Sequence, residues 1–148
     1  MINVEWDTSD FIEVTNKDIQ DVENQLGIKF PLDYIAVIKK FNGCSPIQDL
    51  VSRENFSEPF GYLLSIGKED ESIDLYKTYT NVKDRLIDNV FPFADDPGGN
   101  LYCFDYRSSD HPSICYWDHE EAFENREKAI KFICHTFTDL IESLTEDE

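Results

Sequence analysis

Basic residues are scarce in this sequence of 148 residues, which has 13 Lys and Arg against 31 Asp and Glu. The formal net charge is therefore −18. A surface this acidic repels phosphate backbones and anionic lipid headgroups, so we expect no binding to nucleic acid or to a membrane. Cationic proteins and metal ions are the partners that such a surface attracts.

Long apolar runs and a targeting segment are also missing. No stretch approaches the roughly 18 uncharged apolar residues that a membrane-spanning helix needs. The segment Met1–Glu13 contains acids and no base, unlike the start of a secretory signal. We therefore expect a cytoplasmic protein whose cysteines, Cys44, Cys103, Cys115 and Cys134, are reduced thiols in the core.

Apolar residues are plentiful enough for one hydrophobic core. Hydrophobic residues make up 41% of the chain and aromatic residues 14%. The length suits one ordinary domain, and we see no linker, repeat or low-complexity segment. The sequence predicts one domain over residues 1–148, with its core at about residues 15–144 and an acidic tail after it.

Helix signals dominate the first part of the chain. Thr15 and Asp18 form a capping-box pattern before apolar residues at helical spacing, and Gly27 ends that run. Pro31 is typical of the first turn of a helix, and Asn42-Gly43 ends the second run. We therefore expect a helical hairpin here. A further helix is predicted over 69–86, where acids precede bases.

Strand signals dominate the middle of the chain, and a helix is expected at its end. The predicted strands are Gly61–Gly67, Val90–Ala94, Asn100–Tyr106 and Ser113–Trp117. A final helix is predicted from Asn125 to Leu144, because Ile130, Ile133 and later apolar residues recur every three or four positions. This order predicts a single α+β domain with a mainly antiparallel sheet.

Residue types suited to chemistry occur, but their patterns favour structural roles. Cys103, His111, Cys115 and His119 are zinc-ligand types, yet their spacing matches no zinc motif, so we expect no metal site there. Asp95 and Asp96 adjoin Pro97-Gly98-Gly99, a sequence typical of a tight turn. With Asp105, these aspartates leave open a metal-dependent hydrolase as an alternative function.

A concentration of acids beside aromatic residues is the remaining signal. The segment Phe91–Glu124 holds eight acids and one base. Aromatic groups surrounded by acids can form a surface for a basic partner. The candidate partner-binding residues are Asp95, Asp96, Tyr102, Asp105, Trp117, Asp118, Glu120 and Glu121. The sequence leaves open whether Trp117 lies at that surface or in the core.

Four blocks of the sequence form a pattern when taken in order. The first, Glu23–Gly43, contains P-x-x-Y and ends in N-G. The second, Phe91–Asp105, contains F-A-x-D-x-x-G. The third is Ile114–Glu120, and the fourth is Ile133–Ile141. Together they resemble the SUKH superfamily, which includes the yeast cell-wall assembly regulators and many bacterial immunity proteins, although Thr136 stands where Ser is common in that superfamily.

The resemblance implies a single α+β domain in which the N-terminal helical hairpin and the C-terminal helix pack on a curved, mostly antiparallel sheet. It also implies that the protein is not an enzyme and has no catalytic residues and no cofactor. It implies an immunity protein, or antitoxin, that neutralises a cognate polymorphic toxin by binding it. With the net charge of −18, we expect a basic, nuclease-type toxin whose active surface is covered. The alternative is a regulatory interaction module of the cell-wall regulator type, without a toxin.

Overall fold

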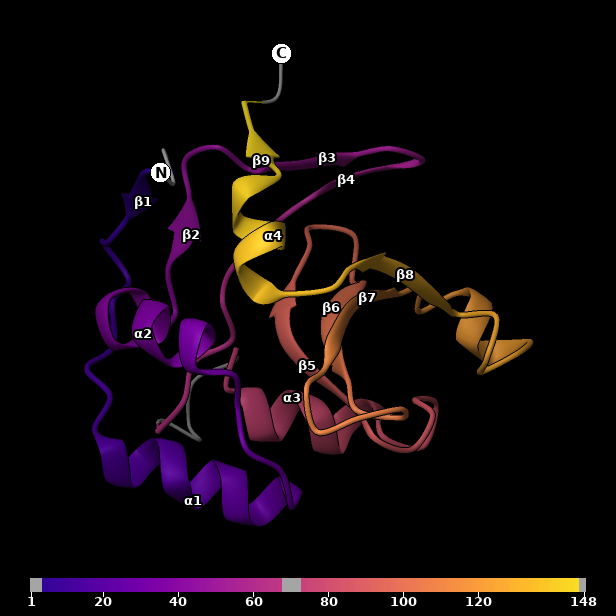
Figure 1. Cartoon of the computed structure of the whole chain (residues 1–148), viewed down its shortest axis with the longest axis horizontal. Coiled ribbons are helices and arrows are strands. Elements are labelled where there is room, and N and C mark those ends of the chain that lie inside the picture. The colour runs from indigo at the N-terminus through magenta and orange to yellow at the C-terminus, as the bar shows by residue number, and fades with distance from the viewer. Residues whose placement is uncertain (1–3, 68–72, 147–148) are drawn as a thin grey trace.

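A four-stranded antiparallel sheet lies at the centre of the molecule (Figure 1). The computed structural model describes residues 4–67 and 73–146. The strands of this central sheet, in spatial order, are β5 (Val90–Asp95), β6 (Leu101–Asp105), β7 (Ser113–Trp117) and β8 (Ile130–Cys134). Helices α1 and α2 lie on one side of it, and α4 lies near its upper end in Figure 1. This arrangement confirms the α+β fold class.

The helical hairpin predicted from the sequence is confirmed. Helix α1 (Asn16–Leu26) begins after Thr15, whose side chain accepts a hydrogen bond from Asp18 N while Asp18 accepts one from Thr15 N. It ends at Gly27, whose φ of 75° is the left-handed conformation that favours glycine. Helix α2 (Leu32–Phe41) begins after Pro31. Local capping chemistry therefore determines these boundaries.

The prediction of one long C-terminal helix was wrong. Residues Ile130–Cys134 form β8, which pairs with β7, and the helix α4 covers only Phe137–Glu142. Isoleucine and phenylalanine favour strands, and pairing on the free edge of β7 outweighed the helical spacing. Thr136 starts α4 by accepting a hydrogen bond from Asp139 N at 3.0 Å. Asn125 caps a turn instead, through Glu127 N and Lys128 N.

The remaining elements differ in detail from the prediction. Gly61–Gly67 is extended and forms no regular ladder: Leu63 makes a single bridge with Ala94 of β5, and Ser65 makes one with Asp74. Helix α3 (Leu75–Val82) is shorter than the predicted 69–86, of which residues 69–72 lie outside the described part. Two small antiparallel sheets complete the fold: β1 (Trp6–Asp7) with β2 (Ser45–Pro46), and β4 (Phe56–Pro59), β3 (Leu50–Arg53) and β9 (Leu144–Thr145).

Both faces of β5, β6 and β7 are buried, whereas Phe132 on the edge strand β8 is 58% exposed. Successive side chains of a strand point to opposite faces. On β6, Tyr102 and Phe104 join the main core with the helices, whereas Leu101 and Cys103 join a second apolar cluster. On β7, Tyr116 and Trp117 divide in the same way. The four cysteines are free and buried, as the sequence predicts.

Tyr34 lies at the centre of the main core and provides a test of its packing. Its ring contacts those of Phe30, Phe93, Phe104 and Phe137, with centroids 5.0 to 6.0 Å away. Among the described residues, its buried hydroxyl has no hydrogen-bond partner. An unsatisfied buried hydroxyl is unfavourable, so we expect Tyr34→Phe to raise the free energy of unfolding by about 1 kcal/mol. Urea denaturation measures the change.

Tyr102 provides the matched control. Its hydroxyl donates a hydrogen bond to Pro59 O at 2.7 Å. Tyr102→Phe is therefore expected to lower the free energy of unfolding by about 1 kcal/mol. Equal destabilisation by the two substitutions would contradict the assignment of Tyr34 as unsatisfied.

Candidate functional site

The turn between β5 and β6 is organised by the Asp96 carboxylate. Asp96 is 6% exposed. Its Oδ1 accepts hydrogen bonds from Gly98 N at 2.8 Å and Asn100 N at 2.9 Å. Gly99 has a φ of 91°. The Asp-Pro-Gly-Gly-Asn sequence thus forms the tight turn that its composition predicts.

A buried polar network joins this turn to the neighbouring strand. The Tyr116 hydroxyl donates a short hydrogen bond to Asp96 Oδ2 and accepts one from Asn100 Nδ2 at 2.7 Å. Asn100 Oδ1 accepts a hydrogen bond from His119 N at 3.0 Å and lies 2.7 Å from His119 Nδ1. The network places the β5–β6 turn beside the segment that leaves β7.

Asp95 points away from this network, as expected for adjacent residues of a strand. Its Oδ1 accepts a hydrogen bond from Tyr62 N at 2.7 Å, and Gly61 leaves room for the carboxylate. A Cβ on residue 61 would lie 2.2 Å from that oxygen. Burial, and secondarily the charge of Asp96, raises the pKa of Asp95 above 3.8, although the Tyr62 N–H opposes the shift.

The raised pKa of Asp95 predicts a pH-dependent effect of Asp95→Asn. A raised pKa means that the fold favours the protonated acid, so this contribution to stability is complete below the unfolded pKa of 3.8 and is lost as the pH rises through the folded pKa. Asparagine keeps an acceptor for Tyr62 N–H but carries no charge. We expect the variant to melt above the parent at about pH 7 and with it at about pH 3. A lower melting temperature at neutral pH would contradict this expectation.

Asp105 lies at the opposite end of β6 and does not join Asp95 and Asp96. It pairs with Val90, whereas Asp95 pairs with Leu101. Burial raises the pKa of Asp105, but the hydrogen bonds and charge of Arg107, 2.8 Å away, outweigh it and lower that pKa. The three aspartates of the hydrolase alternative therefore do not form one site. Within the described ranges, no cluster of three or more metal-ligating side chains occurs.

The aromatic members of the predicted surface are core residues. Tyr102 is fully buried, and Trp117 is 1% exposed. The Trp117 ring belongs to the second apolar cluster, where the Arg85 guanidinium lies 5.4 Å from its centroid. This placement settles the position of Trp117 that the sequence leaves open. Together with buried Asp96, these side chains have almost no surface to offer a partner.

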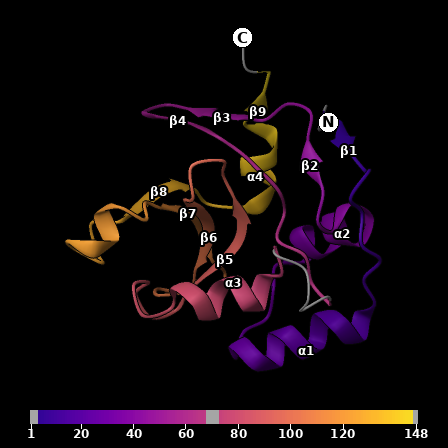
Figure 2. The same ribbon diagram turned by 180° about the vertical axis from the view of Figure 1, so that it is seen from behind.

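Asp118, Glu120 and Glu121 belong to a projecting segment, residues 118–129 between β7 and β8, which we call the acidic loop. It extends from the rest of the ribbon in both views (Figures 1 and 2). Asp118 Oδ1 accepts hydrogen bonds from Glu120 N at 3.0 Å and Glu121 N at 3.3 Å. A short 3-10 turn, Glu121–Phe123, follows. Buried Ala122 and Ala129 fix the loop to the second cluster.

The structure adds Phe123 to the candidate residues. Its side chain is 73% exposed on the acidic loop, and the Arg85 guanidinium lies 5.0 Å from the centroid of its ring. Glu120, Glu121 and Glu124 are its sequence neighbours. The sequence did not single out Phe123, because Trp117 and Tyr102 were the larger aromatic signals. A lone aromatic residue among consecutive acids was the available signal.

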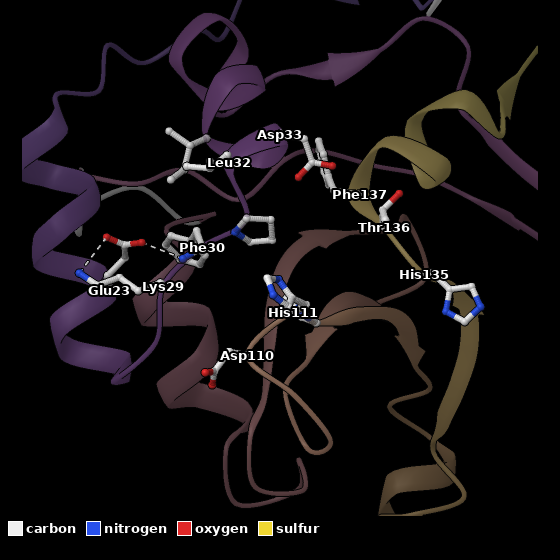
Figure 3. Close-up of a pocket in the computed structure, with 13 residues that line it drawn as sticks. Glu23, Lys29, Phe30, Leu32, Asp33, Asp110, His111, His135, Thr136 and Phe137 are labelled. Atoms are coloured by element: carbon white, nitrogen blue, oxygen red, sulfur yellow. Dashed lines mark hydrogen bonds and ion pairs between the residues drawn. The ribbon is translucent and has the colours of Figure 1, made fainter.

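A second surface feature is an open groove on another part of the molecule (Figure 3). It has a volume of about 810 Å³ and is lined by α2, the loop between β6 and β7, and the junction of β8 with α4. Phe30, Pro112 and Phe137 contribute buried apolar surface. His111 lies near the middle of the view, between Leu32 and Thr136 (Figure 3).

Comparison with known proteins identifies the family. The model of the SMI1 / KNR4 family (SUKH-1) matches residues 13–143. The chain belongs to the SMI1/KNR4 family. A Bacillus subtilis (strain 168) protein described as SPbeta prophage-derived uncharacterized protein YokK is 26% identical over 150 residues, which cover 90% of this chain and 76% of that protein. The resemblance inferred from the four sequence blocks is confirmed at the level of the family.

In this SMI1/KNR4 protein, several residues of the resembling blocks hold the chain together. Buried Glu23 accepts a hydrogen bond from Phe30 N at 2.7 Å and so fixes the connection between α1 and α2. Buried Asn42 bonds to Ile12 O, and to Ile66 N and O. None of the described helices has the length and apolar character needed to cross a bilayer.

Proposed function

We propose that this chain is an immunity protein that binds a cognate cationic toxin domain, of the nuclease type, and covers its active surface. The observation that carries the proposal is the net charge of −18 on a member of the SMI1/KNR4 family. An enzyme that grips nucleic acid presents cations to the phosphates, and an acidic protein can cover them. The Bacillus subtilis relative is described as prophage-derived, which is compatible with this role.

The acidic loop is the surface that we assign to the partner. It carries five acids, Asp118, Glu120, Glu121, Glu124 and Glu127, against Arg126 and Lys128. Opposite charge on the partner would steer the encounter, with association rates towards roughly 10⁸ M⁻¹s⁻¹ at low salt. The proposed surface still includes Asp95 and Asp96, because their negative charges add to the electrostatic potential near the start of this loop. Asp96 itself is buried.

Phe123 supplies the apolar contact that charge alone lacks. Aromatic residues at the centre of an interface account for much of its binding energy when a partner excludes water from them. The Arg85 contact restricts the ring of Phe123 before binding. A ring held in place loses less conformational freedom when the complex forms.

Co-expression with the carboxy-terminal domain of the protein encoded next to this gene tests the proposal. We expect rescue of growth from the toxicity of that domain, and co-purification that is strong at about 50 mM salt and weaker at about 500 mM, where screening is stronger. A catalytically inactive version of the domain should co-purify as well. The complex should no longer cleave nucleic acid.

Two results would count against the proposal. Failure to co-purify at low salt, where attraction is strongest, would contradict binding through the acidic surface. Co-purification of a neighbour that has no toxicity would favour the regulatory interaction module instead. Variants of the acidic loop can be tested in the same co-expression system.

A further inference from the structure

The groove of Figure 3 combines an apolar floor with an exposed apolar rim. Leu32, the first residue of α2, is 83% exposed, and Ile35 is half-buried one turn later on the same helix. Phe30, Pro112 and Phe137 are buried residues of the same lining. A volume of about 810 Å³ is within the range of pockets that hold several side chains or a drug-sized ligand.

The ionised side chains around the groove are mainly acidic. Glu23 is buried and lies 3.9 Å from the ammonium group of Lys29. Asp33 accepts hydrogen bonds from Thr138 N at 3.0 Å and Thr138 Oγ1 at 2.8 Å. Asp110 is exposed on the loop between β6 and β7 and forms no ion pair with any described residue. The net charge of the lining therefore favours a cationic occupant.

We propose that this groove is a docking site for a short protein segment that carries one large aliphatic side chain flanked by lysine or arginine. The aliphatic side chain would lie between Leu32 and the apolar floor. A flanking cation would lie at Asp110, where a partly solvated carboxylate favours an ammonium or guanidinium group. This site is separate from the proposed function. The groove adjoins the beginning of β7, whereas the acidic loop adjoins its end, and docking in the groove does not require a toxin.

Charge disfavours two other occupants. A second copy of this chain would bring together two molecules of net charge −18. The acidic tail of the chain, Thr145–Glu148, has the same sign as Asp33 and Asp110. Like charges in contact oppose association, so the basic segment of a different protein fits the groove best.

Nuclear magnetic resonance titration of the ¹⁵N-labelled full chain tests the proposal. The probe is a short synthetic peptide with a central leucine flanked by lysines, and its controls replace the lysines with glutamate or the leucine with serine. We expect the first peptide to shift the amide signals of Leu32, His111 and Thr136, and the two controls to bind at least about tenfold more weakly.

Substitutions at exposed positions locate the contact without unfolding the protein. Leu32→Ser is expected to weaken binding of the lysine–leucine peptide about tenfold, and Asp110→Lys about fivefold with a smaller dependence on salt. Ile47→Ser is the matched control, because Ile47 is also exposed, at 51%, and lies outside the groove. It should leave the affinity unchanged.

The proposal is overturned by any of three results. These are no binding of the lysine–leucine peptide, equal binding of the glutamate peptide, or equal affinities of the Leu32→Ser and Ile47→Ser variants. Phe123→Ser should not affect peptide binding. A loss of peptide affinity in this variant, together with amide shifts on the acidic loop of the parent protein, would show that basic peptides bind the acidic loop and not the groove.

Discussion

Replacing Asp96 with alanine is expected to lower the free energy of unfolding by about 3 kcal/mol, because it removes a buried acceptor that several donors share. Gly98 N, Asn100 N and the Tyr116 hydroxyl all donate to this carboxylate. Hydrogen bonds to a charged group are stronger than neutral ones, and the abandoned donors would remain partly buried. Chemical denaturation followed by circular dichroism measures the loss.

Asp95→Ala is the matched control, since it removes a carboxylate from the adjacent position. Asp95 accepts from Tyr62 N, and its pKa is raised by burial, so its charged form contributes little. We expect a loss of less than about 1 kcal/mol. If Asp96→Ala lowers the free energy of unfolding no more than Asp95→Ala does, Pro97 and the glycines hold the turn without the Asp96 network.

A double-mutant cycle with Tyr116→Phe isolates the contact between Asp96 and the tyrosine. The single substitution removes the hydroxyl and keeps the ring, which packs against Phe56 with centroids 5.2 Å apart. We expect a coupling free energy of about 1 to 2 kcal/mol for the pair. An additive double variant would mean that the tyrosine hydroxyl is satisfied elsewhere, for example by Glu58 at 3.5 Å.

The parts of the fold that the sequence predicts well are those specified by local chemistry. The capping box at Thr15, the left-handed Gly27 and the Asp96 turn depend on residues a few positions apart. Such signals can be recognised without knowing what else packs nearby. Gly27 and the Asp96 turn also belong to the blocks that carry the family resemblance.

The sequence fails where a distant partner decides the structure. The apolar residues of Ile130–Cys134 have helical spacing, but this segment pairs with the free edge of β7 and forms a strand. The exposure of Trp117 likewise depends on the second apolar cluster, which includes Leu86 and Ala129 from other parts of the chain. The groove combines three segments far apart in sequence, so no local pattern could indicate it.

The same reasoning changes the candidate site. The sequence predicts an acidic surface with aromatic residues near its centre, and the aromatic residues assigned to that surface lie on strands. Because both faces of β6 and β7 are covered, strand positions such as Tyr102 and Trp117 became core. Phe123, on the acidic loop, has no opposing layer and stays exposed, as does Phe132 on the edge strand β8. Part of the charge pattern survives this correction, because Asp118, Glu120 and Glu121 remain accessible on the acidic loop while Asp96 is buried.

Reversing three charges on the acidic loop is expected to have the largest effect on the proposed function. With Glu120, Glu121 and Glu124 changed to lysine, association with the cationic toxin domain should slow by about 100-fold at low salt and much less at high salt. Phe123→Ala should instead raise the dissociation rate by about 30-fold, because a buried aromatic contact is lost after docking. Stopped-flow and surface plasmon resonance measurements separate the two rates.

The matched control makes the same change in net charge at positions outside the acidic loop. Glu13, Glu54 and Glu142 are exposed and lie outside the acidic loop, so changing them to lysine gives a protein of equal net charge. If the loop is the contact surface, this control slows association only about threefold, through the weaker overall field. Equal slowing by the two triple variants would mean that net charge alone attracts the partner. The Phe123→Ala dissociation rate would then decide whether the loop touches it at all.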